Sequence, residues 1–322
     1  MTGSVAKMKM IVMTLWRAGA MTASALTLAV ASLTGCGTDS SSAASSGKVD
    51  VVAAFYPFAF VAQQVGGNDV TVVNLTKPGA EPHDLELTPR QVAAISEADL
   101  AIYLKGFQPS VDEAIQQNRP AHTLEVSKVV PLTRPVSPDA QGDNQDHSHP
   151  SGDPHVWLDP TKLAAVARAV GEQLAAADPP HAADFRARAA ALVTRLDGLD
   201  ADLRAGLRNC RQKAFVTSHA AFGYFAERYG LEQIAIAGLS PEAEPAPARI
   251  QQIQREVEER GITTIFFETL VSPDLAETIA RDTGATTAVL DPIEGIKDPS
   301  RDDYFSVMRA NLGALRKALG PC

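Results

Sequence analysis

The stretch from Asp178 to Arg208, DPPHAADFRARAAALVTRLDGLDADLRAGLR, decides the fold. Apolar side chains recur in it at spacings of three and four residues with no strand-like break, which is the pattern of one amphipathic helix. The recurring residues are Phe185, Ala189, Leu192, Leu196, Leu199, Leu203 and Leu207. At 1.5 Å per residue this helix is roughly 40 Å long, so we expect it to act as a rigid strut between two lobes.

Short apolar runs alternate with amphipathic stretches on both sides of this helix. The runs expected to be strands are 49–55, 70–75, 100–104, 213–217, 262–267 and 286–290. Helices are expected after Tyr56, Thr88 and Pro109, around Ile253, and from Ser272. Such alternation is typical of βα units and parallel sheets. The sequence therefore predicts an α/β protein in which lobes 49–177 and 209–322 are joined by a long backbone helix, 178–208.

The N-terminus has the features of a bacterial lipoprotein signal. Lys7, Lys9 and Arg17 form a positive region, residues 18–33 carry no charge, and small residues precede Cys36. We expect residues 1–35 to be the signal peptide, Cys36 to carry lipid, and 36–48 to be a flexible tether. The protein is then exported and held on the outer face of the cytoplasmic membrane, or on its periplasmic side. The alternative is a transmembrane anchor. A spanning helix needs roughly 20 apolar residues, however, and the uncharged stretch 18–33 is shorter than that.

The net charge of the chain after residue 35 bears on its possible partners. The first 35 residues hold three of the 29 basic residues and no acidic one, which leaves 26 against 38 and a formal charge of −12. Nucleic acid is therefore not expected as a partner, because polyphosphate binding needs a basic face.

After Cys36, the remaining cysteines are Cys210 and Cys322. An even number in an oxidising compartment favours a disulfide between them, with two free thiols as the alternative.

Four candidate metal ligands follow predicted strands or lie in the loops after them. They are His83, His155, His219 and Asp291. The carboxyl ends of strands in open α/β sheets are where ligands bind, and two candidates precede the long helix while two follow it. Imidazoles with one carboxylate suit Zn²⁺, whose tetrahedral shell four protein ligands close. We therefore expect one metal ion in the cleft between the lobes.

Several ordered motifs together resemble a known family. They are the Pro-His-Asp turn at 82–84, Asp-Pro-His-Val-Trp-Leu-Asp-Pro at 153–160, Thr-Ser-His-Ala-Ala-Phe-Gly-Tyr-Phe at 217–225, Leu-Ser-Pro-Glu-Ala-Glu-Pro at 239–245, and Leu-Asp-Pro at 290–292. The chain is similar to the zinc and manganese solute-binding lipoproteins of ABC transporters, the cluster A-I group that includes ZnuA. The resemblance implies two (β/α) lobes, a single metal in the cleft, and delivery to a permease with its ATPase. We expect a monomer.

The resemblance also bears on the choice of metal. Histidine as the third ligand is typical of zinc members, so His219 favours zinc, with a Mn²⁺-binding homologue as the alternative. His147 and His149, in the polar segment 142–152, are a possible accessory metal loop or part of a plain solvated loop. Glu268 either orients a ligating imidazole or competes with Asp291 as a ligand.

A zinc-dependent hydrolase is the rival function. It would need an open coordination position and a general base, and the sequence has no His-Glu-x-x-His pair. Four protein ligands would leave no place for a substrate, so we do not expect an enzyme. Nothing in the chain suggests the apolar patch of an adhesin, and no set of groups for an organic solute can be identified.

Overall fold

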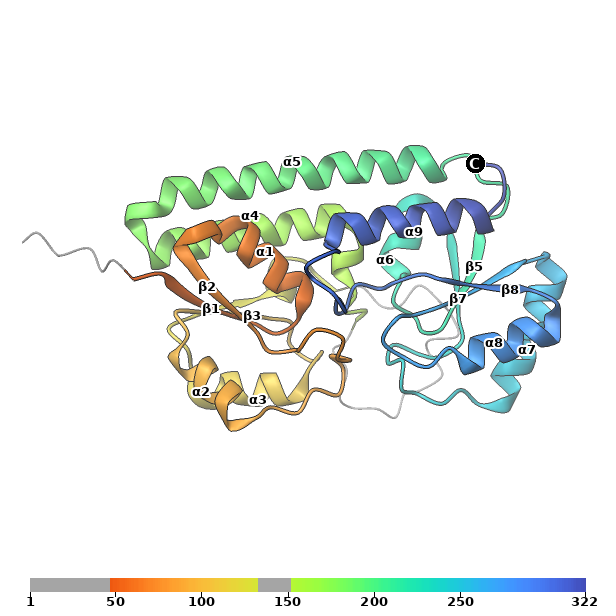
Figure 1. The fold of residues 1–322 in the computed structure, drawn as a ribbon, viewed down its shortest axis with the longest axis horizontal. Coiled ribbons are helices and arrows are strands. Elements are labelled where there is room, and N and C mark those ends of the chain that lie inside the picture. Colours follow the sequence, from red (N-terminus) through yellow and green to blue (C-terminus); the bar gives the residue numbers. More distant parts are fainter. Residues whose placement is uncertain (1–46, 133–151) are drawn as a thin grey trace, which may run out of the picture. The chain divides into compact units, whose positions relative to one another are not determined.

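Two four-stranded parallel sheets organise the computed structural model, which describes residues 47–132 and 152–322 (Figure 1). The strands run in the order β2-β1-β3-β4 in the first sheet and β6-β5-β7-β8 in the second. Their bounds are β1 Val49–Ala53, β2 Val70–Asn74, β3 Leu100–Tyr103, β4 His122–Glu125, β5 Ala214–Thr217, β6 Glu232–Ala235, β7 Thr264–Phe267 and β8 Thr286–Val289. The predicted α/β class with parallel sheets in two lobes is confirmed; β4 and β6 were not predicted.

Helices connect and cover these strands. The α-helices are α1 Tyr56–Gly66, α2 Pro89–Glu97, α3 Pro109–Asn118, α4 Pro160–Ala177, α5 Ala182–Leu207, α6 Gly223–Tyr229, α7 Pro247–Arg260, α8 Asp274–Thr283 and α9 Tyr304–Ala318. Short 3₁₀ turns are η1 Gly67–Asp69, η2 Val126–Lys128, η4 Val156–Leu158 and η5 Pro179–His181. Of these helices, the sequence patterns predicted α1, α2, α3, α5, α7 and α8.

The long helix α5 begins later than its apolar pattern suggests. The expected helix started at Asp178, whereas α5 starts at Ala182 after the turn η5. Pro179 and Pro180 cause this delay, because a proline disfavours helical backbone in the residue before it. From Ala182 onward α5 is continuous for 26 residues. It packs against α4 and α1 on the side of the first sheet and against α6 and α9 on the side of the second (Figure 1).

The second sheet separates two hydrophobic cores. Alternate residues of a strand point to opposite faces, and on β5 Phe215 joins the large core that also holds the buried stripe of α5. Val216, its neighbour, joins a smaller core with Ile253 of α7 and Ile279 of α8. The large core extends without a break to the first sheet. The two sheets are therefore connected through packed side chains as well as through α5.

A disulfide between Cys210 and Cys322 fastens the segment after α9 to the segment after α5. This is the pairing that the cysteine count favours. Backbone hydrogen bonds lie beside it, since Arg211 N donates to Pro321 O and Gln212 N donates to Leu319 O.

Some sequence predictions lie outside the described residues. They are the signal peptide 1–35 with Cys36, all but the last two residues of the tether 36–48, and the two histidines His147 and His149. Among the helices that are described, none has the length and apolar character required to cross a bilayer.

Candidate metal centre

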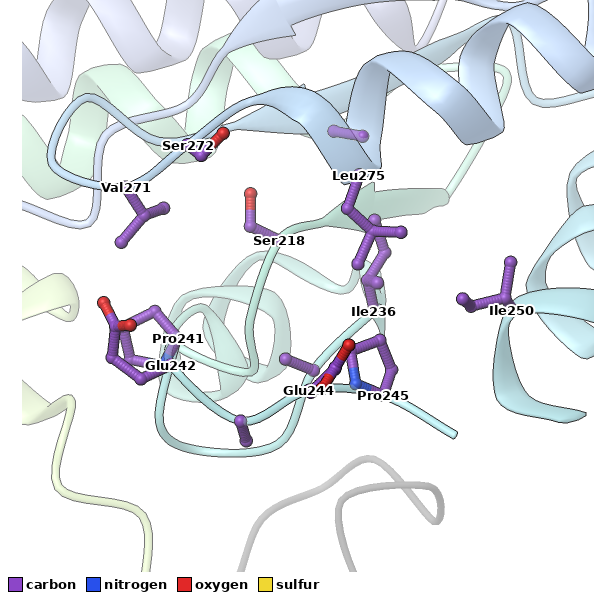
Figure 2. A pocket seen from close by; sticks show the side chains of 13 residues that line it. Ser218, Ile236, Pro241, Glu242, Glu244, Pro245, Ile250, Val271, Ser272 and Leu275 are labelled. Carbon is purple, nitrogen blue, oxygen red and sulfur yellow. The ribbon is translucent and has the colours of Figure 1, made fainter. Parts of the chain in front are cut away.

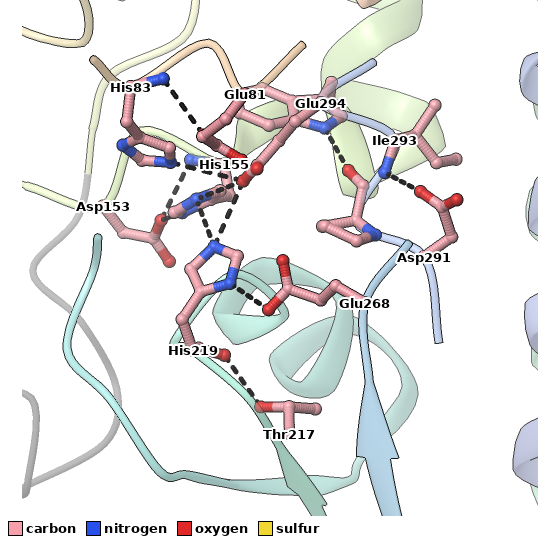
Figure 3. A network of polar contacts seen from close by, with 12 residues as sticks. Glu81, His83, Asp153, His155, Thr217, His219, Glu268, Asp291, Ile293 and Glu294 are labelled. Atoms are coloured by element: carbon pink, nitrogen blue, oxygen red, sulfur yellow. Dashed lines mark hydrogen bonds and ion pairs between the residues drawn. The ribbon is translucent and has the colours of Figure 1, made fainter. Parts of the chain in front are cut away.

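Three histidines and one glutamate converge on a single point (Figure 3). His83 comes from the loop between β2 and α2, and His155 directly precedes η4. His219 follows β5, and Glu294 lies in the segment after β8. One donor atom from each of the four lies within 4.8 Å of the others, and all four side chains are buried. All four residues lie in segments that come after the carboxyl ends of strands, two in each sheet. Open α/β sheets bind ligands at this edge.

The spacing of the donor atoms fits a tetrahedral ion. Glu294 Oε1 lies 3.4 Å from Nε2 of His83, 3.2 Å from Nε2 of His155 and 3.1 Å from Nε2 of His219. The Nε2 atoms of His155 and His219 are 3.3 Å apart. Donors at about 2.0–2.1 Å from a tetrahedral zinc ion are separated by about 3.3–3.4 Å. These four separations match a zinc shell, and all the donor atoms lie within 4.8 Å of one another.

Carboxylates orient two of the imidazoles from behind. Asp153 Oδ1 lies 2.8 Å from Nδ1 of His155, and Glu268 Oε1 lies 2.5 Å from Nδ1 of His219. A carboxylate that accepts the Nδ1 proton fixes the tautomer in which Nε2 is free to bind a metal. Of the two roles that the sequence left open for Glu268, its position is that of a group that orients an imidazole.

The chain just before each histidine holds its loop in place. Asp153 Oδ1 also accepts a hydrogen bond of 2.9 Å from the backbone N–H of His155, which closes an Asx turn. Glu81 Oε1 accepts one of 3.0 Å from the N–H of His83. Thr217, the last residue of β5, donates from Oγ1 to the carbonyl of His219 at 2.8 Å. Local hydrogen bonds thus position each of the three histidines independently of any ion.

Burial of these charges without basic residues favours a cation. Glu294 and Glu268 are buried, and in the described part of the chain their ion-pair partners are histidines. Burial alone would raise the pKa of Glu294, but His219 and His83 hold it well below its ordinary value. Burial, followed by repulsion from Glu294, raises the pKa of Glu81 to about 8.

The pKa values of the three imidazoles do not shift in the same direction. Burial lowers the pKa of His83 despite the opposing effect of Glu294. Burial would also lower the pKa of His155, but hydrogen bonds to Asp153 and Glu294 raise it overall. For His219 burial is again opposed, by the charges of Glu268 and Glu294, and its pKa lies well above the ordinary value. The raised pKa favours the protonated form of His219, which lies between the carboxylates of Glu268 and Glu294.

Asp291 does not join this group, although the sequence pattern suggested it as the fourth ligand. Its Oδ1 accepts a hydrogen bond of 2.8 Å from the backbone N–H of Ile293, and its Oδ2 accepts one of 2.8 Å from Thr269. The structure brings Glu294 to the position that had been expected for Asp291 (Figure 3). The reason is the turn after β8: its first carboxylate folds back onto the backbone, and the next acidic residue reaches the histidines.

A separate hollow of about 490 Å³ lies in the second lobe (Figure 2). Its apolar lining includes Ile236, Ile250 and Leu275, and the loop with Glu242 and Glu244 contributes to its wall. Ser218 also lines it and directly precedes His219. Among the described residues, no histidine lines the hollow, so the donor cluster and this pocket are different features of the second lobe.

Most of the chain matches one protein family. The family model described as zinc-uptake complex component A, periplasmic (ZnuA), matches residues 51–318. The chain belongs to this family. All four members of the donor cluster fall within the matched range.

Several named proteins are identical to this ZnuA-family chain at about a third of the aligned positions. The zinc-binding protein AdcA of Streptococcus pyogenes is 36% identical over 287 residues, and the AdcA of Streptococcus pneumoniae, 35% identical, is named a zinc-binding lipoprotein. Both matches take in 84% of the chain, which spans only 56% of the length of either relative. ZnuA of Bacillus subtilis, a high-affinity zinc uptake system protein, is 32% identical, with 88% of this chain and 92% of that protein covered.

The fold is also similar to a solved structure of a ZnuA-like domain. The Zn(II)-bound ZnuA-like domain of AdcA from Streptococcus pneumoniae has a TM-score of 0.69 and 34% identity to this chain. The alignment covers 85% of this chain and 99% of that domain.

Proposed function

We propose that this protein captures Zn²⁺ outside the cytoplasm and delivers it to an ABC permease for uptake. The observation that carries the proposal is the buried cluster of three Nε2 atoms and one carboxylate oxygen at zinc-like spacing. In this proposal His83 and His155 come from the first lobe, 49–177, and His219 and Glu294 from the second, 209–322. The helix in the region 178–208 joins the lobes. The names of the AdcA and ZnuA relatives support zinc as the cargo.

Chemistry favours zinc over manganese at this cluster. Imidazole nitrogens suit Zn²⁺, while Mn²⁺ prefers sites with more oxygen ligands. Here three of the four donors are nitrogens. A Mn²⁺-binding protein of the same transport class remains the second candidate, and competition between the two ions distinguishes them.

The same cluster argues against hydrolysis. A catalytic zinc keeps one coordination position for water or substrate, whereas four protein donors fill a tetrahedral shell. The donors are also buried, so a substrate would have to displace a protein ligand to reach the ion. We therefore assign capture and release to the protein, and no catalysis.

The experiment is metal analysis and competitive titration of the mature protein with Zn²⁺ and Mn²⁺. We expect one Zn²⁺ per chain, with Mn²⁺ binding far more weakly. Replacing two ligands together, in H83A/H155A, should abolish tight binding, and E294Q should weaken it by at least a hundredfold. H122A is the matched control, because His122 is an exposed histidine at the far end of β4. Unchanged stoichiometry and affinity in H83A/H155A would contradict the proposed site.

The proposed location depends on the N-terminal residues. The signal at 1–35, a lipid on Cys36 and a tether at 36–48 would hold the protein at the membrane, where its permease and ATPase work. The lipoprotein name of the S. pneumoniae relative supports this arrangement. In a bacterial expression host, C36A should move the protein from the membrane fraction to the soluble fraction. Light scattering of the soluble form tests the expectation of a monomer.

A further inference from the structure

The segment that carries Glu294 contains an unfavourable backbone conformation. Ile293, directly before Glu294, has a φ of 57°, and in the described residues only one other non-glycine residue, Arg119, has a positive φ. Ile293 is also buried, at 0% exposure. A β-branched residue rarely adopts the left-handed region, and such a conformation persists only where its surroundings hold it. The question is what holds it here.

Asp291 provides the main restraint on this turn. Its Oδ1 accepts the hydrogen bond from the N–H of Ile293, and its Oδ2 accepts one from the hydroxyl of Thr269, two residues after β7. The backbone of Asp291 is fixed in turn by Asn311 of α9. The Asn311 side chain accepts from Asp291 N at 2.9 Å and donates to Asp291 O at 2.7 Å. Asp291 thus links two elements of the second lobe to the strained residue.

The first lobe holds the next residue of the same turn. Trp157 of η4 is fully buried and donates from Nε1 to the carbonyl of Pro292 at 2.7 Å. Pro292 lies between Asp291 and Ile293, so groups of both lobes hold the two residues that precede the strained one. From this turn the Glu294 side chain points toward His83, His155 and His219 (Figure 3).

We infer that Asp291 is a positioning residue for zinc: its carboxylate stabilises the left-handed turn at Ile293, which aims Glu294 at the three histidines. This inference rests on the proposed function and adds to it a residue that controls affinity without touching the ion. Direct ligation by Asp291 is the competing explanation. Its two oxygens instead accept hydrogen bonds from the turn and from the segment after β7, and it lies outside the cluster of donor atoms.

A double-mutant cycle distinguishes the two explanations. Glycine adopts the left-handed region as readily as the right-handed one, so I293G makes the turn independent of the Asp291 restraint. We expect D291A to weaken zinc binding by about 10–100-fold, as loss of a group that orients a ligand does. In the I293G background the same D291A change should cost about threefold or less. An equal loss in both backgrounds would overturn the inference.

Two further measurements keep the test decisive. D291N retains an oxygen that accepts from Ile293 N, so we expect zinc affinity within about threefold of wild type and an unchanged visible spectrum of the Co²⁺-loaded protein. E294Q should alter that spectrum, because it replaces a ligand. If D291N alters the spectrum as E294Q does, Asp291 is a ligand and the inference is wrong.

Folding and the proposed function have their own readouts. Because Ile293 is buried, I293G is checked by far-UV circular dichroism, and I293N serves as a second background, since asparagine tolerates the left-handed region. Failure of the wild-type protein to bind zinc would refute the proposed function. Normal wild-type binding without coupling between positions 291 and 293 would refute this inference alone.

Discussion

His219 lies between two carboxylates, with Glu268 at Nδ1 and Glu294 at Nε2. Burial opposes protonation of this imidazole, but the two carboxylates raise its pKa well above the ordinary value of 6.5. The raised pKa favours a proton on Nε2 of His219, the nitrogen that faces Glu294, when no metal is bound. Metal and proton compete for the same atom.

The first residue-scale prediction concerns this competition. Zinc binding at pH 7 should release a proton from His219, and apparent affinity should keep rising above pH 6.5 until the raised pKa of His219 is passed. His83 should contribute no proton, because its pKa is lowered, whereas His155, whose pKa is raised, adds to the count. Titration calorimetry in buffers with different protonation enthalpies measures the proton count. E268Q removes one of the carboxylates that raise the pKa of His219, so it should release fewer protons at pH 7; an unchanged count would contradict this account.

The same shift has a sign for stability. The pKa of His219 is higher in the folded metal-free protein than in the unfolded chain. Its contribution to stability is therefore complete below about pH 6.5 and is lost as the pH rises through the folded pKa. Zinc removes this dependence, because the bound imidazole no longer titrates. Thermal melting of the two forms between pH 6.5 and 9 should diverge, with the metal-free form losing stability.

Sequence patterns reveal the histidines of this site better than its carboxylate. His83, His155 and His219 each lie beside a proline or after a strand end, where a polar side chain is conspicuous. Glu294 lies in an irregular segment with no periodic signal, and Asp291 appeared first after the strand. The Asp-Pro-Ile-Glu-Gly sequence at 291–295 was the available clue, since a second acidic residue followed within three positions. A left-handed isoleucine cannot be anticipated from composition, because packing from both lobes holds it.

At the scale of elements, α5 carries two glycines in different surroundings. A Cβ built on Gly198 would have no heavy atom within 4 Å, whereas one on Gly206 would lie 2.9 Å from Leu312 Cδ1 of α9. G198A should therefore stabilise the protein by about 0.5–1 kcal/mol, because alanine is the better helix former. G206A should show less gain or a loss, since α9 must shift to admit the methyl group. Chemical denaturation measures both, and equal gains would mean that α9 packs loosely on α5.

Element boundaries were harder to anticipate than the elements themselves. Strands β1, β2 and β3 begin where the apolar runs begin, at Val49, Val70 and Leu100. Strands β4 and β6 were not predicted: both start with polar residues, at His122 and Glu232, and two of the four residues of β4 are exposed. Pairing with a buried neighbour, β3 or β5, supplies what their own sequences lack. Tertiary pairing overrides weak local preference in such strands.

At the scale of the whole molecule, α5 limits how far the lobes can separate. It is continuous from Ala182 to Leu207 and packs against helices on both sides, with Leu196 and Leu203 fully buried. Zinc capture should therefore need little closure. X-ray scattering profiles of metal-free and zinc-loaded protein should nearly superimpose, while hydrogen exchange slows in the loops around His83, His155, His219 and Glu294. A large contraction on loading would contradict the rigid-strut account.

The disulfide makes the second lobe a covalent ring. Cys210 lies before β5 and Cys322 after α9, so every peptide bond between them is bypassed by the sulfur–sulfur link. The exposed stretch at Glu242–Glu244 is the kind of loop tip where proteases cut. A single cut there opens the ring but releases no fragment: His219 stays on one piece, Glu294 on the other, and the cystine holds both together. A nicked molecule would therefore keep all four residues of the donor cluster until a reductant separated its halves.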